Sequence, residues 1–232
     1  MSMDNDLARL LAEATFFPGL NVRLAALKPL VELAENQLDV ARAAAIAHVR
    51  VEHVRKGQLL HTEDQTFDLL ELEQQVTHLL PKLTRGGLVL TIWSTFERSV
   101  KDIAFRVGSH TCRPLPRDYF RSHFLSKAET VFRSHCSGLI AFPNVQQLAQ
   151  LKFLLSVRNT LIHHDGRLNE APPNVALLGL QELAAAGIQI ERDFDFTYIV
   201  PTEEFTQASA TLVYTYVHEL AARVFNSLVP LE

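Results

Sequence analysis

Three polar side chains come together near the end of one predicted helix: Arg158, Asn159 and His163. Asn159 and His163 are four residues apart and so share a helix face one turn apart, and the long Arg158 side chain can reach the same place. Histidine titrates near neutral pH and acts as acid or base, whereas arginine binds phosphate oxygens with paired hydrogen bonds. This combination suits the cleavage of RNA, in which a base takes the proton of the 2′-hydroxyl and a cation stabilises charge at phosphorus. Such chemistry requires no metal ion or other cofactor.

The same residues also have purely structural interpretations. Arg158 can pair with a carboxylate in the core, and Asn159 and His163 can cap the carboxyl end of the helix. His164 and Asp165 follow directly and can tune His163, but an Asp before a glycine is also typical of a turn. Spacing alone leaves both interpretations open.

The helix that carries these residues is predicted to begin after Asn144, a good capping residue, and to end near Asp165-Gly166. Its predicted buried face comprises Leu148, Leu151, Leu154, Leu155, Leu161 and Ile162. Continuing this face by helical spacing reaches Arg158, where an apolar residue is expected. Burial of an unpaired cation is costly, so Arg158 is expected to meet a carboxylate or to line a site or interface.

Most of the remaining chain is also predicted to be helical. Helices are expected from Pro29 to Gly57, from Thr62 to a stop or kink at Pro81, after Gly86-Gly87, from Pro116 and from Thr202. A short helix is expected within 175–183, and alternating apolar residues between 187 and 200 predict a β-hairpin. The predicted fold is mainly all-α, with an N-terminal helical extension over 1–60 and a helical domain over 61–232.

Apolar spacing predicts which faces are buried. In the helix from Pro29 these positions are Leu27, Val31, Ala34, Leu38, Ala41, Ala45 and His48. After Gly86-Gly87 they are Val89, Ile92, Trp93, Phe96, Val100, Ile103 and Val107. In the last helix they are Phe205, Ala208, Leu212, Tyr216, Leu220 and Val224.

The stretch Arg158-Asn159-Thr160-Leu161-Ile162-His163-His164-Asp165-Gly166 resembles the signature of the HEPN superfamily. In that signature an arginine, usually followed by a polar residue, precedes a histidine by a short gap. An upstream helix with an aromatic-Glu pair, here Phe96-Glu97, is a further similarity. The likeness covers roughly Gly86 to Leu228 in helix order, whereas residues 1–60 have no counterpart.

The resemblance implies a HEPN-like helical bundle that forms homodimers with the two motifs facing each other. In many members it also implies metal-independent endoribonuclease activity in toxin–antitoxin, antiviral or RNA-processing settings. Arg158 would then stabilise the scissile phosphate, Asn159 would help to position it, and His163 would be the acid or base. An antitoxin or a nucleotidyltransferase is an implied partner. The alternative is a non-catalytic HEPN module that binds a partner protein or a nucleotide.

Glu97 is a supporting candidate with two interpretations. It can pair with Arg158 across two helices, or it can pair with Lys101 four residues along its own helix.

The formal net charge of −4 is unevenly distributed along the chain. Residues 85–135 carry 9 Lys and Arg against 4 Asp and Glu, a net charge of +5, whereas residues 1–84 carry 8 against 12 and residues 136–232 carry 5 against 10. The middle segment can face a polyanion, with Arg117 and Arg121 as predicted RNA contacts on a helix that also buries Phe120 and Phe124. A solvated surface balanced by nearby carboxylates is the alternative.

Composition sets the remaining expectations. A hydrophobic share of 47% suits a protein that buries its own core. With no apolar run of about 20 residues and an acidic first segment, we expect neither a membrane span nor a secretory signal, and a cytoplasmic location. Two cysteines, Cys112 and Cys136, are expected to be reduced thiols, and their spacing to His110 and His135 matches no known zinc motif.

Overall fold

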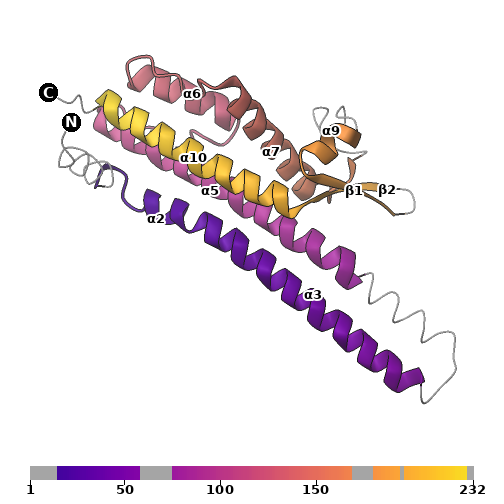
Figure 1. The fold of residues 1–232 in the computed structure, drawn as a ribbon. Helices are drawn as coiled ribbons and strands as arrows, with labels where there is room; N and C mark the ends of the chain where they lie inside the picture. The colour runs from indigo at the N-terminus through magenta and orange to yellow at the C-terminus, as the bar shows by residue number, and fades with distance from the viewer. Residues whose placement is uncertain (1–14, 58–74, 169–179, 194–195, 229–232) are drawn as a thin grey trace. The chain divides into compact units, whose positions relative to one another are not determined.

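The computed structural model describes residues 15–57, 75–168, 180–193 and 196–228, and these are mainly helical (Figure 1). The elements in order are α2 (Leu20–Ala25), α3 (Leu27–Gly57), the π-helical turn η1 (Gln75–Leu79), α5 (Leu80–His110), α6 (Phe124–His135), α7 (Val145–His163), α9 (Leu180–Ala185), β1 (Ile188–Asp193), β2 (Phe196–Pro201) and α10 (Glu203–Leu228). The mainly helical fold with a small hairpin before the last helix is therefore confirmed. No helix in the described part of the chain has both the length and the apolar character that a membrane span requires.

The backbone packs as two compact units. Unit 1 comprises Met1–Lys28, Thr91–Val157 and Ala208–Glu232, and unit 2 comprises Pro29–Leu90 and Arg158–Gln207. The unit boundaries fall inside α5, α7 and α10, so each of these helices contributes residues to both units. The domain boundary predicted at residue 60 lies outside the described residues and stays a prediction.

Aromatic side chains fill the core of unit 1. The ring of Phe96 lies 5.0 Å from that of Trp93 and 5.7 Å from those of Phe124 and Tyr216, and Phe142 stacks on Tyr216 at 5.3 Å. Every predicted core position of α5, from Val89 to Val107, is buried, so that prediction is confirmed. Edge-to-face ring packing of this kind fixes the neighbouring helices beyond what buried area alone contributes.

The connection from α6 to α7 is held by polar groups of unit 1. Glu129 accepts the N–H groups of Ala141 and Phe142 at 2.8 and 3.3 Å, and the Tyr216 hydroxyl donates to the Ala141 carbonyl at 3.1 Å. Arg223 donates to the same carbonyl at 2.9 Å. Burial raises the pKa of Tyr216, so its hydroxyl keeps the proton that it donates.

α7 then begins as predicted. The side-chain oxygen of Asn144 accepts the N–H groups of Gln146 and Gln147 at 2.9 and 3.1 Å. These bonds satisfy two of the amide groups that a helix leaves free at its start, which stabilises the helix by about 1 kcal/mol.

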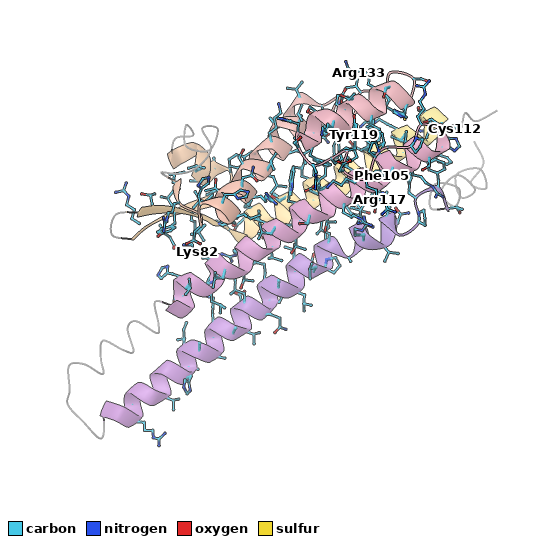
Figure 2. All side chains as sticks on the ribbon, turned by 180° about the vertical axis from the view of Figure 1, so that it is seen from behind. Lys82, Phe105, Cys112, Arg117, Tyr119 and Arg133 are labelled. Atoms are coloured by element: carbon cyan, nitrogen blue, oxygen red, sulfur yellow. The ribbon has the colours of Figure 1, made fainter. Side chains whose placement is uncertain are left out.

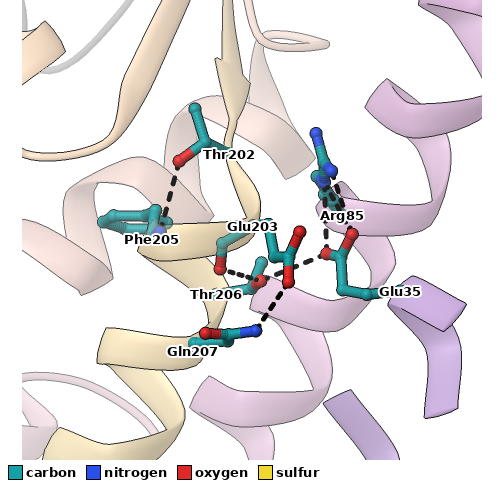
Figure 3. A network of polar contacts seen from close by, with 7 residues as sticks. All are labelled: Glu35, Arg85, Thr202, Glu203, Phe205, Thr206 and Gln207. Carbon is teal, nitrogen blue, oxygen red and sulfur yellow. Dashed lines mark hydrogen bonds and ion pairs between the residues drawn. The ribbon is translucent and has the colours of Figure 1, made fainter. Parts of the chain in front are cut away.

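A buried ion pair joins the helices of unit 2 (Figure 3). Glu35 of α3 is 4% exposed, and Arg85 of α5 donates to both of its carboxylate oxygens at 2.9 to 3.1 Å. The Thr206 hydroxyl of α10 lies 3.3 Å from Glu35 Oε1 and 2.8 Å from the Glu203 carbonyl. The carboxylate is thus compensated mainly by a bidentate guanidinium contact, as burial of a charge requires, and the Thr206 hydroxyl shares its one proton between Glu35 and the Glu203 carbonyl.

The hairpin and the start of α10 are coupled through Gly187. Strands β1 and β2 pair antiparallel with Ile188 opposite Pro201, and Thr202 donates its N–H to the Gly187 carbonyl at 2.9 Å. Gly187 has a φ of 79°, and a Cβ there would lie 3.0 Å from Phe205 Cβ, so a side chain at this position would strain the backbone and crowd Phe205. Thr202 caps α10 through the Phe205 N–H at 3.3 Å, as predicted, and its hydroxyl lowers the pKa of Glu204.

Two predicted helix starts are wrong. α5 begins at Leu80 and runs through Gly86-Gly87, because burial of Leu88 and Val89 outweighs the roughly 1 kcal/mol that each helical glycine costs. Pro81 lies in the first turn of α5, where a missing N–H is tolerated, directly after the π-helical turn. The helix predicted from Thr62 falls outside the described residues.

Pro116 also begins no α-helix. Residues 117–122 form turns, with the Tyr119 N–H bonded to the Pro116 carbonyl at 3.0 Å, and α6 begins only at Phe124. His123 has a φ of 53°, a left-handed conformation that interrupts helical hydrogen bonding before Phe124. Arg117 and Arg121 therefore lie on turns and not on an amphipathic helix.

Two predicted faces are correct only in part. In α10 Phe205, Tyr216, Leu220 and Val224 are buried as predicted, but Ala208 is exposed, and Ala210, Val213 and Val217 are also buried. In α3 Leu27, Val31 and Leu38 are buried as predicted, but Ala41 and His48 are exposed. Alanine and histidine tolerate either environment, so a pattern that relies on them fixes the angle of a helix poorly.

The buried ion pair makes a prediction about stability. Arg85→Ala leaves the Glu35 carboxylate buried without its cation and should destabilise the fold by about 3–5 kcal/mol at neutral pH in urea denaturation. Arg98→Ala is the matched control, because Arg98 is exposed and pairs with Asp102 four residues away. It should cost roughly 0.5 kcal/mol or less. Equal destabilisation of the two variants would contradict a structural role for the buried pair.

Candidate functional site

The carboxyl end of α7 is fixed by backbone hydrogen bonds. The helix ends at His163, and Asp165 and Gly166 take left-handed φ values of 51° and 77°. The Gly166 N–H returns to the Thr160 carbonyl at 2.9 Å, and the Gly166 carbonyl accepts the Ile199 N–H of β2 at 2.8 Å. The predicted stop at Asp165-Gly166 is therefore confirmed, and the turn is tied to the hairpin.

Arg158 and Asn159 lie in direct contact. The Arg158 guanidinium donates through Nη1 to the Asn159 side-chain oxygen at 2.8 Å, and both side chains are half-buried. His163, one turn further along the helix, is exposed. The structure thus brings two of the three predicted catalytic residues into hydrogen-bond contact and places the third at the same helix end.

The predicted burial of Arg158 is wrong. The buried face of α7 runs through Leu151, Leu154, Val157 and Thr160, so the apolar position belongs to Val157, and Arg158 lies at its edge. Ile162 is likewise 42% exposed. The buried positions of α7 are spaced three residues apart, so its buried face shifts gradually around the helix. The prediction continued this face in steps of four and seven residues, which lead to Arg158 instead of Val157.

Arg158 keeps hydrogen-bond donors available. Among the described residues, no carboxylate lies within ion-pair distance of its guanidinium. A guanidinium has five N–H donors, and the contact with Asn159 uses one of them and orients the group. The remaining donors are suited to an anion such as phosphate.

The residues after the motif serve the turn. The His164 carbonyl accepts the Arg167 N–H at 2.8 Å, and the His164 side chain is half-buried. Asp165 is exposed and left-handed, which agrees with its interpretation as a turn residue. No described group bonds the His163 imidazole, so the protein does not fix its tautomer through a neighbour in the described part of the chain.

The hairpin adds groups that the sequence did not single out. Arg167 forms an antiparallel bridge with Tyr198 of β2, and Lys82 Nζ lies 3.8 Å from the centre of the Tyr198 ring. Lys82 is labelled in Figure 2. His78 approaches Glu191 of β1 at 3.5 Å. These contacts join η1 and the start of α5 to a hairpin more than 100 residues later. The spacing of residues along the sequence could therefore not predict them.

Glu97 takes the simpler of its two predicted roles. It pairs with Lys101 on the next turn of α5, and both side chains are 29% exposed. The structure therefore shows the surface pair, which contributes only a few tenths of a kcal/mol.

The basic segment of unit 1 is partly neutralised. Lys101 and two arginines, Arg98 and Arg133, pair with carboxylates four residues away, and Lys127 donates to the Tyr119 carbonyl. The solvated-surface interpretation holds for these residues.

In the described part of the chain, three arginines of the α5–α6 connection lack the carboxylate partner that Arg98, Lys101 and Arg133 have. Arg113, Arg117 and Arg121 are exposed, follow one another at intervals of four residues, and have no carboxylate within ion-pair distance among the described residues. Arg117 is labelled in Figure 2. Arg117 and Arg121, the predicted RNA contacts, thus belong to the part of the basic segment that keeps free charge.

Within residues 15–57, 75–168, 180–193 and 196–228, no three His, Cys, Asp or Glu side chains form a group able to hold a metal ion. Cys112 is an exposed free thiol, whereas Cys136 is buried, and burial raises its pKa. Comparison of the chain with known protein families, characterised proteins and solved structures finds no match. The resemblance to the HEPN superfamily therefore stays an expectation from the sequence.

The free arginines make a prediction about RNA affinity. The double variant Arg117→Ala, Arg121→Ala should bind single-stranded RNA more weakly at every sequence. Its salt dependence should flatten by about 0.7 in logarithmic slope for each phosphate group that the protein no longer binds. The matched control is Arg98→Ala, Arg133→Ala, which removes the same charge from paired positions and should change the slope less. Filter binding over a range of salt concentrations measures both. Identical slopes in the wild type and the first variant would exclude these arginines as RNA contacts.

Proposed function

We propose that this protein is a metal-independent endoribonuclease of the HEPN type that cuts RNA and leaves a 2′,3′-cyclic phosphate end. The observation that carries the proposal is the contact between Arg158 and Asn159 at a helix end that also presents His163 to solvent. These are the residue types, in the order and spacing, that the HEPN signature combines.

The proposed mechanism assigns each residue a separate task. Arg158, oriented by Asn159, binds the non-bridging oxygens of the scissile phosphate and stabilises the charge that develops there. His163 takes the proton of the 2′-hydroxyl or gives one to the departing 5′-oxygen, and its exposure leaves it accessible to a polymer substrate. The turn at Asp165-Gly166, tied to β2, holds the helix end in place.

A toxin or phage-defence setting in the cytoplasm agrees with this activity. A small antitoxin or a nucleotidyltransferase is the corresponding proposed partner. The family resemblance also leads us to propose a homodimer in which two motif helices face each other, so that one RNA strand meets both copies of Arg158.

Cleavage in the presence of EDTA tests the proposed chemistry. The purified protein should cut single-stranded RNA with the metal chelated, and His163→Ala should reduce the rate about 100-fold or more, because it removes the acid or base. His78→Ala is the matched control, since it removes another exposed histidine of unit 2 outside the motif. Equal rates for wild type and His163→Ala would remove His163 from the mechanism.

Arg158 and Asn159 should separate binding from catalysis. Arg158→Ala is expected to lower the cleavage rate far more than RNA affinity, because its contact is with one phosphate in the transition state. Asn159→Ala should have a smaller effect in the same direction, since it only orients the guanidinium. Single-turnover cleavage beside equilibrium binding distinguishes the two quantities.

A non-catalytic HEPN module that binds a partner protein or a nucleotide is the second candidate. It is favoured by the lack of a described hydrogen-bond partner for His163, because catalytic histidines are commonly oriented by a neighbour. Absence of cleavage combined with retained binding of RNA or nucleotide, abolished in Arg158→Ala, would favour this module over the ribonuclease.

A further inference from the structure

Helix α3 has a second apolar face that its own unit leaves uncovered. Its buried side includes Val31, Glu35 and Leu38. A different face of the same helix carries eight exposed residues at alternating intervals of three and four. They are Leu30, Leu33, Gln37, Val40, Ala44, Ala47, Val51 and Val54. We call these eight residues the α3 stripe.

The α3 stripe is both long and strongly exposed. Leu33, Val40, Val51 and Val54 are 57 to 64% exposed, and Leu30 is 42% exposed. Isolated apolar residues on a surface are normal, but seven apolar residues out of eight in a strict three-four repeat are the pattern of a helix–helix seam. From Leu30 to Val54 the stripe extends about 36 Å at 1.5 Å per residue.

The side chains of the stripe are complementary to the same stripe in reverse. If two copies of α3 pair antiparallel about residue 42, Leu30 meets Val54 and Leu33 meets Val51 at the ends. In the middle Val40 meets the small Ala44, and Gln37 meets Ala47 by the same alignment. Large residues thus lie opposite small ones near the two-fold axis, as interdigitated packing requires.

Charge favours the same orientation. Residues 29–41 carry Glu32, Glu35 and Asp39 and no basic residue, which leaves a net charge of −2 once Arg85 neutralises Glu35. Residues 42–57 carry four Lys or Arg against one Glu, a net charge of +3. Antiparallel pairing places the acidic half of each helix beside the basic half of the other, whereas parallel pairing would place like charges together.

We infer that α3 forms an antiparallel, two-fold symmetric helix pair with α3 of a second copy of this chain. The contact is isologous, because the same stripe serves both copies, and its length brings the buried area to the order of 1,000 Å² that a stable interface needs. It is separate from the proposed contact between motif helices, since it uses none of residues 158–166.

Mass measurement tests the contact. The wild type at micromolar concentration should show by light scattering at least twice the chain mass of 26.1 kDa. Val40→Glu with Val51→Glu should halve the measured mass, because each dimer would bury four charges. Glutamate favours helix more than valine does, so far-ultraviolet circular dichroism should show α3 retained.

Val145→Glu is the matched control, because Val145 is 80% exposed and lies outside the stripe. It should leave the mass unchanged. A wild-type monomer, or an assembly whose mass is the same in the double variant, would overturn the inference, and the second result would point to another interface.

Crosslinking tests the orientation. In a Cys112→Ser background, which removes the exposed native thiol, a mixture of Leu30→Cys and Val54→Cys chains should form a mixed disulfide under mild oxidation. Rapid disulfide formation between two Leu30→Cys chains would show parallel pairing and contradict the proposed arrangement. Cleavage of RNA by the double variant, which lacks only the α3 contact, would separate this inference from the proposed function, which does not depend on it.

Discussion

Unit 2 depends on how the charge of Glu35 is compensated. A carboxylate in an apolar helix face is unfavourable unless hydrogen bonds replace the water that it loses. Here the Arg85 guanidinium forms a bidentate contact with the Glu35 carboxylate, and the Thr206 hydroxyl lies beside one of its oxygens. These three residues come from α3, α5 and α10, so a single carboxylate sets the relative positions of three segments that are distant in sequence.

The candidate site is positioned by backbone groups more than by side chains. Thr160, Gly166 and Ile199 link the last turn of α7 to β2, and Gly187 links the hairpin to the start of α10. Arg158 and Asn159 then need only a short local bond to hold their orientation. A site built in this way keeps its shape while its polar side chains stay accessible to a ligand.

Local signals in the sequence were sufficient for much of this architecture. The Asn144 cap, the Asp165-Gly166 turn, the hairpin and the Thr202 cap depend on residues within a few positions of each other, and all four predictions are confirmed. The burial of α5 was also predictable, because its apolar residues are large and regularly spaced.

Predictions failed where distant contacts decide the outcome. Gly86 and Gly87 are weak helix formers that packing keeps helical, and the left-handed His123 delays α6 in a way that Pro116 does not reveal. Arg158 was placed one position away from the true buried face, which passes through Val157. Glu35 did carry a signal, as a carboxylate between Val31 and Leu38, but its partner Arg85 lies 50 residues away and could not be chosen from spacing.

The bond from the Ile199 N–H to the Gly166 carbonyl has a practical meaning for spectroscopy. This amide belongs to the hairpin, and its hydrogen bond to the turn that follows the motif must open before its proton exchanges with solvent. Its exchange rate and chemical shift therefore register the state of the motif turn from a position that touches none of the proposed catalytic side chains. The Ile199 amide can therefore report on ligand binding at the carboxyl end of α7 without any change to the residues under study.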